Sequence, residues 1–369
     1  MLAELDRHPH ARAVLAPALS RDAEASHAYL FHGPGGAGKR AAARALAAEW
    51  LAAGVVDPEG ARARAAAGTH PDLTWVAPSG AHEILVSDID RPVVAASSMT
   101  PFEAGRRVFV IERVDELGAQ AANKMLKTLE EPPSFVHLIL LTERLAEVLP
   151  TIRSRCQLVR FDASPEEEVA AELTALGTAP GTALACARLA LGDATRARAL
   201  SSPGGVELRV QAEAFARSAL AGRVASARPW SGLLAAVHDR GEKIRAEMDA
   251  RIAAEIELYP LKERRRVQSE WAERSRRARR RGETEALDFA LSLVSLWFSD
   301  LARLAWDGPE LVRHLDRRRE LEADIGRDPQ RLRAAIEAVE DTRLRFNLNV
   351  SEDLACEALA YRLEETLGW

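Results

Sequence analysis

The chain has 369 residues, and its 50 lysines and arginines against 55 aspartates and glutamates give a formal net charge of -5 at pH 7. This length allows two or three domains, and the slightly acidic balance excludes a nucleic-acid-binding surface spread over the whole chain. The three cysteines, Cys156, Cys186 and Cys356, are odd in number and far apart, which argues against a disulfide framework and a Cys-x-x-Cys metal site.

The most apolar segment covers residues 289–298. It is far shorter than the roughly 20 residues that cross a bilayer, so we expect a buried helix there. Charged residues appear from Glu4 onward, which is not the pattern of a secretory signal peptide. We therefore expect a cytoplasmic protein that makes no membrane contact.

The first predicted elements surround a glycine-rich loop. A helix over residues 5–20 precedes an apolar strand over 27–31, and an alanine-rich helix over 40–53 follows the loop. Gly33, Gly38 and Lys39 fit the pattern G-x-x-x-x-G-K, in which backbone N–H groups form an anion nest at a helix N-terminus and the lysine reaches the outer phosphates. We expect these residues, together with Gly36, to form a phosphate-binding loop.

The position after Lys39 departs from this pattern. A Ser or Thr hydroxyl is needed there as a Mg²⁺ ligand, and the chain has Arg40, which cannot bind a metal ion. The loop thus keeps its shape and loses part of its chemistry. Because a phosphate nest does not strictly require a metal, residual binding of ATP or ADP stays open.

Four more strands are predicted to alternate with helices. The strands cover residues 70–76, 108–111, 136–141 and 157–161; helices are expected from about 87, over 119–131 and over 150–154, while residues 54–69 show little periodicity. This alternation predicts an α/β fold with a doubly wound, parallel, five-stranded sheet, whose ligands lie at the carboxyl ends of the strands.

The rest of the chain is predicted to be helical. Ser164 is expected to cap a helix with Pro165 at its first position, and short helices follow to Leu200. Residues 201–205 have the composition of a linker, and beyond them apolar helix faces cover 287–306 and 354–367. We divide the chain into domains at 1–162, 163–204 and 205–369.

Basic residues are concentrated over 262–266 and 274–281, interleaved with glutamates. Two interpretations stay open. The arginines can form a solvated helix face with salt bridges, or a patch for a phosphate backbone.

Four stretches besides the glycine loop resemble the bacterial clamp-loader subunits of the AAA+ class. They are residues 27–31, Thr-His-Pro-Asp-Leu at 69–73, the run ending Leu-Lys-Thr-Leu-Glu-Glu-Pro-Pro at 121–133, and the run ending Ser-Arg-Cys at 149–156. The His-Pro-Asp-Leu stretch is more similar to the delta-prime type of DNA polymerase III than to the motor type, gamma/tau. The resemblance implies an AAA+ sheet domain, a small helical lid domain and an all-helical collar domain.

Motor members of the family carry Asp-Glu after a buried strand, for Mg²⁺ and for water activation, and the matching positions here are Glu112 and Arg113. An arginine cannot accept a proton. The sensor arginine of the motor lid falls on Thr195, beside Arg196. These losses imply a subunit that does not hydrolyse ATP, with no cofactor required.

The family's delta-prime members also carry four zinc-binding cysteines between the loop helix and the His-Pro-Asp-Leu strand. Residues 51–69 of this chain contain none, so we expect no zinc and no other metal.

Arg155, in Ser-Arg-Cys, is the expected catalytic residue. In the family this arginine reaches the nucleotide of a neighbouring motor subunit as an arginine finger in trans. Arg153 is expected to be structural, Cys156 to be a buried apolar group, and His70 to shape the turn before Pro71.

The resemblance thus implies a non-hydrolysing, delta-prime-like subunit of the replicative clamp loader, in a pentameric ring with the delta and gamma/tau subunits. Through that assembly it would act on the sliding clamp and primed DNA. Two alternatives stay open: an active motor ATPase of the gamma/tau type, and an unrelated P-loop switch outside replication.

Overall fold

The computed structural model describes residues 5–19, 25–78, 83–256, 260–306, 308–346 and 350–368. The chain forms two compact units, Met1–Ser164 and Pro165–Trp369, which are described separately. No helix in these ranges combines the length and the apolar character that a membrane span requires.

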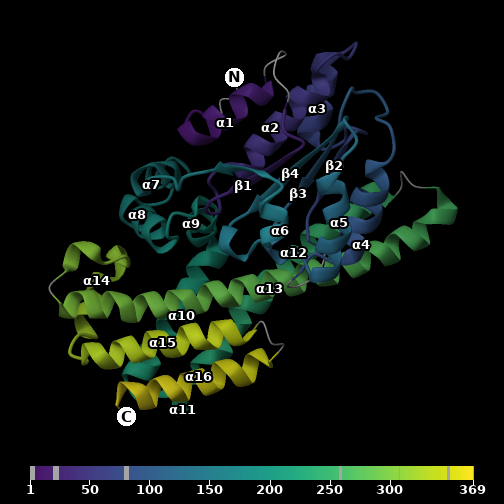
Figure 1. The fold of residues 1–369 in the computed structure, drawn as a ribbon. Helices are drawn as coiled ribbons and strands as arrows, with labels where there is room; N and C mark the ends of the chain where they lie inside the picture. The colour runs from purple at the N-terminus through teal and green to yellow at the C-terminus, as the bar shows by residue number, and fades with distance from the viewer. Residues whose placement is uncertain are drawn as a thin grey trace. The chain divides into compact units, whose positions relative to one another are not determined.

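The first unit is built on a parallel sheet of five strands (Figure 1), as the alternating pattern predicted. The strands lie in the order β2 (Leu73–Val76), β3 (Arg107–Ile111), β4 (Val136–Thr142), β1 (Ala28–His32) and β5 (Gln157–Arg160). Every residue of β4 is buried, which explains its continuous apolar sequence. β1 lies between β4 and β5, with Leu30 beside Leu140 on one side and Leu158 on the other.

Helices cover both faces of this sheet. They are α1 (Pro9–Leu19), α2 (Lys39–Ala52), α3 (Pro58–Ala67), α4 (Val86–Ile89), a π-helix (Asp90–Ala95), α5 (Ala119–Glu130) and α6 (Pro150–Arg153). Because side chains alternate along a strand, Val108 and Val110 of β3 join the core with α1 and α2, and Phe109 and Ile111 join the core with α5.

The strands differ from the predicted ranges by one residue, except that β2 begins at Leu73 rather than residue 70. The strand is entered through the turn expected at His70, where the Leu73 N–H donates to the carbonyl of His70. The segment without clear periodicity contains α3, which begins after an Asp57 side-chain cap and ends at Gly68 with φ 75°.

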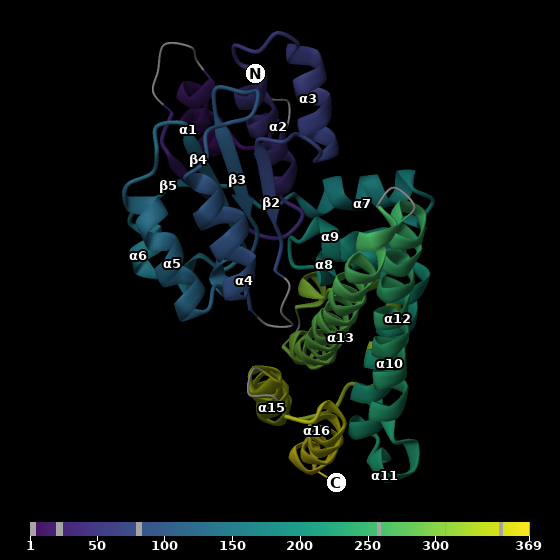
Figure 2. The same cartoon turned by 90° about the vertical axis from the view of Figure 1, so that its right-hand side faces the viewer.

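The second unit is helical and has one continuous core. Its helices are α7 (Glu166–Ala175), α8 (Pro180–Leu189), α9 (Ala194–Ser201), α10 (Pro203–Leu220), α11 (Val224–Ala227), α12 (Pro229–Glu255), α13 (Leu261–Ala305), α14 (Arg318–Ala323), α15 (Pro329–Arg345) and α16 (Glu352–Leu367). Figure 2 shows α10, α12, α13, α15 and α16 from a second direction. The buried helix predicted over 289–298 is confirmed as part of α13, with Leu291, Val294 and Trp297 in the core. The division into lid and collar domains stays a prediction.

Two predictions about this unit are wrong. Pro165 itself occupies the cap position before α7, so Ser164 does not cap it. Residues 201–205 are not a linker, because Ser202 caps α10 by accepting from the Gly205 N–H at 3.3 Å. A Cβ on Gly205 would lie 1.9 Å from the Ala199 carbonyl oxygen, so this glycine permits close packing between α9 and α10.

Candidate functional site

The glycine loop lies between the end of β1 and the start of α2. Gly33, Gly36 and Gly38 have φ values of 142°, 72° and 86°, a region that side-chain-bearing residues rarely adopt. A Cβ on Gly33 would also lie 2.1 Å from the carbonyl oxygen of Phe161, at the end of β5. The loop therefore has the backbone shape of an anion nest at the first turn of a helix.

The Lys39 side chain is directed at the loop itself. Its Nζ donates to the carbonyl oxygen of Gly33 at 2.5 Å and to that of Pro34 at 2.6 Å, and the residue is buried. The Lys39 ammonium group is thus hydrogen-bonded to two backbone carbonyl oxygens of the loop. A phosphate bound there would have to compete with these bonds.

Arg40 is paired with Glu112, the residue at the end of β3. Arg40 Nη2 lies 2.8 Å from Glu112 Oε1, and the same oxygen accepts the indole N–H of Trp75 at 2.5 Å. Arg40 and Glu112 match the two positions that hold Mg²⁺ in the motor subunits that the motifs resemble. In this chain their side chains form an ion pair with each other. Trp75 was not singled out from the sequence, although its position at the third residue of β2, beside β3, offered a signal.

Arg113 follows with φ 55°, and its Nη2 lies 2.7 Å from Glu116 Oε1. The nearby carboxylate of Asp115 accepts from the Thr142 hydroxyl at 2.6 Å and from Arg144 Nε at 3.0 Å. Two donors already meet Glu112 at its Oε1, and both neighbouring substitutions, Arg40 and Arg113, are cations. No group of three or more His, Cys, Asp or Glu in the described ranges is placed to hold a metal.

Arg155 follows α6, and its polar contacts lie outside the glycine loop. Its Nη2 lies 2.5 Å from Glu130 Oε1, and its Nη1 donates to the Thr151 carbonyl at 2.8 Å. Its side chain is 34% exposed. Glu130 belongs to the Leu-Glu-Glu-Pro-Pro run, so the two most specific sequence motifs meet in one ion pair; the sequence showed both motifs but not this contact.

The neighbours of Arg155 differ in burial. Arg153 is exposed, so its structural role stays a prediction, and Cys156 is partly buried. Burial raises the pKa of the Cys156 thiol to about 12, so the group is neutral and unreactive near neutral pH.

The His-Pro-Asp-Leu motif is a structural turn, as predicted for His70. The Asp72 N–H donates to His70 Nδ1 at 3.1 Å, and His70 Nε2 lies 3.1 Å from Glu103 Oε1. The Asp72 carboxylate accepts the backbone N–H groups of Phe102, Glu103 and Ala104. Burial opposes ionisation of Asp72, but these bonds outweigh it and lower its pKa.

In the second unit, Thr195 is exposed on α9. Arg196 Nε lies 3.3 Å from Asp193 Oδ2, and its guanidinium lies 5.4 Å from the centre of the Phe289 ring. Both contacts of Arg196 are therefore structural ones inside this unit.

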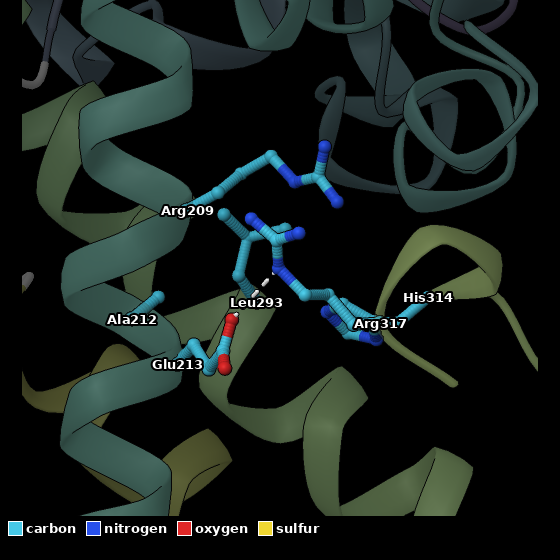
Figure 3. Close-up of a pocket in the computed structure, with 6 residues that line it drawn as sticks. All are labelled: Arg209, Ala212, Glu213, Leu293, His314 and Arg317. Carbon is cyan, nitrogen blue, oxygen red and sulfur yellow. Dashed lines mark hydrogen bonds and ion pairs between the residues drawn. The ribbon is translucent and has the colours of Figure 1, made fainter. Parts of the chain in front are cut away.

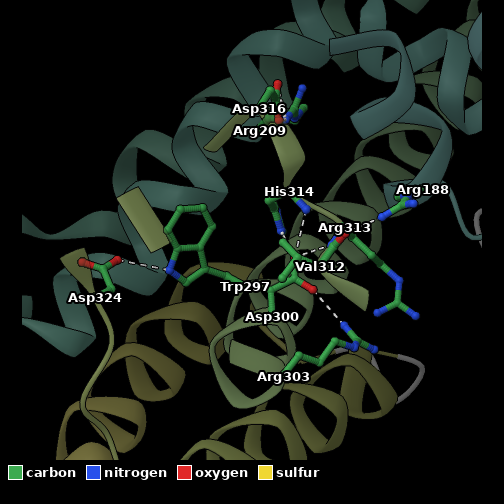
Figure 4. A network of polar contacts seen from close by, with 10 residues as sticks. All are labelled: Arg188, Arg209, Trp297, Asp300, Arg303, Val312, Arg313, His314, Asp316 and Asp324. Carbon is green, nitrogen blue, oxygen red and sulfur yellow. Dashed lines mark hydrogen bonds and ion pairs between the residues drawn. The ribbon is translucent and has the colours of Figure 1, made fainter. Parts of the chain in front are cut away.

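Two further polar features lie in the second unit. Figure 3 shows a cavity beside Arg209, Glu213 and Arg317, whose ≈ 10 Å³ is about the room that one water needs. Figure 4 shows buried Asp300, which accepts from the backbone N–H groups of Arg313 and His314 and contacts His314 Nδ1 at 2.8 Å. Both the cavity and the contacts of Asp300 are therefore structural features of the second unit.

The sheet order and the glycine loop at the end of β1 define an α/β domain of the P-loop kind. Residues 8–165 match the family described as "DNA polymerase III, delta subunit". The delta-prime subunit of DNA polymerase III from Pseudomonas aeruginosa is 40% identical over 139 residues, which are 36% of this chain and 42% of that protein. The Bacillus subtilis delta-prime subunit is 39% identical over 140 residues, 37% of this chain and 42% of that protein.

The gamma/tau subunit of Mycobacterium tuberculosis (strain H37Rv) is also similar, 31% identical over 181 residues, which are 46% of this chain and 30% of that protein. Residues 8–165 are therefore similar to the matching part of DNA polymerase III delta-prime subunits, which agrees with the resemblance that the motifs indicated. The matched part spans 42% of the length of each delta-prime relative named above.

Proposed function

We propose that the chain is the delta-prime subunit of the DNA polymerase III clamp loader, that it does not hydrolyse ATP, and that it supplies Arg155 to a neighbouring motor subunit. Its partners in this proposal are the gamma/tau and delta subunits and, through the assembly, the sliding clamp and primed DNA. It requires no cofactor and no zinc. Residual ATP or ADP binding at Gly33, Gly36, Gly38 and Lys39 is compatible with it.

The ion pair between Arg40 and Glu112 is the observation that carries the non-hydrolysing role. Metal-assisted phosphoryl transfer needs a Mg²⁺ site and a group that positions water. Here Arg40 occupies the position of a Mg²⁺ ligand, and its guanidinium neutralises the carboxylate of Glu112. Arg113 occupies the position of the group that would position water. Each change opposes the same reaction.

The environment of Arg155 supports the role in trans. Its guanidinium is held by Glu130 and the Thr151 carbonyl and is partly exposed. A cation fixed before the partner arrives can stabilise charge on a transferred phosphoryl group without first losing side-chain freedom. Such fingers contribute on the order of 10³ to 10⁵ in rate.

Reconstitution with the gamma/tau and delta subunits tests this role. Clamp- and DNA-stimulated ATPase is compared among wild type, Arg155→Ala and the control Arg153→Ala. We expect a loss of at least about 10²-fold for Arg155→Ala alone. An unchanged rate for Arg155→Ala would remove the role assigned to it.

An active motor of the gamma/tau type is the second candidate, favoured by the intact G-x-x-x-x-G-K spacing and the gamma/tau similarity. It predicts ATPase activity in the isolated chain that Lys39→Ala abolishes. Our proposal predicts no turnover by the isolated chain with Mg²⁺ and ATP.

A further inference from the structure

Helices α12 and α13 form a long antiparallel hairpin whose far part extends beyond α15 and α16 (Figure 1). The two helices approach closely at two glycines. A Cβ on Gly241 would lie 2.5 Å from Glu283 Cγ, and one on Gly282 would lie 2.2 Å from Ile244 Cδ1. Ser275 Oγ donates to Asp249 Oδ1 at 2.9 Å farther out. The hairpin is therefore a packed element.

Its outer part carries a concentration of positive charge. Residues 262–281 contain ten lysines and arginines against three glutamates, in a chain whose net charge is -5. Some of these cations form ion pairs within the second unit: Arg277 pairs with Glu273, Arg279 with Glu283 and Arg281 with Glu285 along α13, and Arg280 pairs with Glu352 of α16. The expectation of a salt-bridged helix face holds for this group.

A second group has a different environment. Lys262, Arg265 and Arg276, here called the basic stripe, are exposed. At 100° per residue they fall within about 60° of one another, on a side of α13 that includes neither buried Val267 nor buried Ser275. Within the residues that the structure describes, Lys262, Arg265 and Arg276 form no ion pair.

Lys262 is unfavourable for the helix itself. α13 begins at Leu261, so Lys262 lies in its first turn, where the helix dipole favours acidic residues. Lys262 and Arg266 are also like charges four residues apart, which repel. Helix stability alone therefore does not account for Lys262.

We propose that the basic stripe binds the phosphate backbone of duplex DNA, which deepens the clamp-loader role proposed above and rests on it. Lys262 and Arg276 are separated by about 21 Å along the helix, the length of about six base pairs. Arginine suits phosphate oxygens through paired N–H donors.

An acidic protein partner is the competing occupant. Protein interfaces usually include large apolar or aromatic anchors at their centre. Leu261 is exposed at the outer end of the stripe, but between Lys262 and Arg276 the described side chains include no exposed large apolar group. Arg274 lies over the Trp271 ring, 5.7 Å from its centre. The stripe thus offers charge without an apolar centre, which favours a phosphate backbone.

The test measures binding of the full chain, without ATP or partner subunits, to a fluorescent duplex of about 30 base pairs with random sequence. Wild type is compared with the triple variant Lys262→Ala/Arg265→Ala/Arg276→Ala. The control is Arg318→Ala/Arg333→Ala/Arg345→Ala, which removes the same charge from exposed residues that have acidic partners. Circular dichroism verifies that both variants fold.

Each phosphate contact contributes about 0.9 to the slope of log K against log salt concentration. Three lost contacts reduce the slope by about 2.7, so between 50 and 200 mM salt the wild type should lose about 40-fold more affinity than the triple variant. The control variant should keep the wild-type slope.

Equal slopes for wild type and triple variant would overturn the proposal, as would no DNA binding at 50 mM salt. Binding to poly-glutamate as tightly as to DNA would also overturn it, in favour of an acidic protein. None of these outcomes bears on Arg155, whose role is tested by the ATPase of the reconstituted assembly.

Discussion

Arg40 and Glu112 form an ion pair across the start of α2 and the end of β3, with 2.8 Å between Arg40 Nη2 and Glu112 Oε1. By the resemblance to clamp-loader motors, the pair joins the two positions that match their Mg²⁺ ligands. Because Arg40 is 70% exposed, we expect it to contribute little to stability. The ion pair instead affects the binding of Mg²⁺, because it occupies Glu112.

Arg40→Thr should therefore create Mg²⁺-dependent nucleotide binding. The substitution supplies a hydroxyl and releases Glu112 from its cation. We expect ATP affinity in Mg²⁺ to rise about tenfold, or about 1.4 kcal/mol, measured by titration calorimetry with and without the metal. ATP turnover should stay absent because Arg113 is unchanged.

Arg40→Ala is the matched control, since it releases Glu112 without adding a hydroxyl. The same gain of Mg²⁺ dependence in Arg40→Ala would show that the hydroxyl position is not what limits metal binding.

Gly33→Ala should destabilise the first unit by at least about 2 kcal/mol. The new Cβ would lie 2.1 Å from the Phe161 carbonyl oxygen, at a φ of 142°. Gly105→Ala is the control, because its added Cβ meets no atom within 4 Å. Thermal unfolding of both variants should show a large fall in Tm for Gly33→Ala only; similar values would contradict the packing argument.

The sequence predicted the sheet well because buried parallel strands are continuous apolar runs, as in β3 and β4. It missed α3, although Asp57 at the cap, Pro58 at the first position and Gly68 after the end are start and stop signals. The helical periodicity of apolar residues is weak over residues 58–67, because alanine and arginine alternate without forming a distinct apolar face. Composition alone also made residues 201–205 resemble a linker.

The candidate site was predicted only in part. The residue types at Lys39, Arg40, Glu112 and Arg155 could be identified position by position. Their partners could not, because the pairs Arg40–Glu112 and Arg155–Glu130 join residues from different elements. Pattern analysis identifies residues along one element, whereas these contacts depend on the order of strands and helices.

Asp300 should make the second unit sensitive to acid. Burial opposes its ionisation, but the bond to His314 and the backbone N–H groups outweigh burial and lower its pKa. The lowered pKa means that its stabilising effect is complete above the unfolded pKa, about 3.9, and is lost as pH falls through the folded value. Unfolding free energy should therefore fall below about pH 4.

Asp300→Asn should cost about 2–4 kcal/mol at pH 7 and reduce this acid loss, as followed by urea unfolding over pH 2–7. Asp239→Asn is the control, since Asp239 lies in an exposed pair with Lys243. If the unfolding free energy of Asp300→Asn fell at low pH as it does in the wild type, other carboxylates would determine the acid sensitivity.

Glu130→Ala should lower the stimulated ATPase of the reconstituted clamp loader, if Arg155 acts in trans as proposed. The substitution removes one of three partners of the guanidinium and leaves the bonds to the Thr151 carbonyl and the Ser154 hydroxyl. We expect a loss of about 3- to 10-fold in kcat, smaller than for Arg155→Ala, because a mobile finger is correctly placed for only part of the time.

The KM for ATP should stay unchanged in Glu130→Ala, because Glu130 would position Arg155 and would not bind the nucleotide. Glu131→Ala provides the control: it removes the adjacent exposed carboxylate, which forms no ion pair among the described residues. A kcat for Glu130→Ala equal to that of Glu131→Ala would show that the contact between Glu130 and Arg155 does not position the Arg155 guanidinium for catalysis. A parallel fall in thermal stability would instead assign Glu130 to the fold, since a positioning residue on an exposed surface changes kcat without changing Tm.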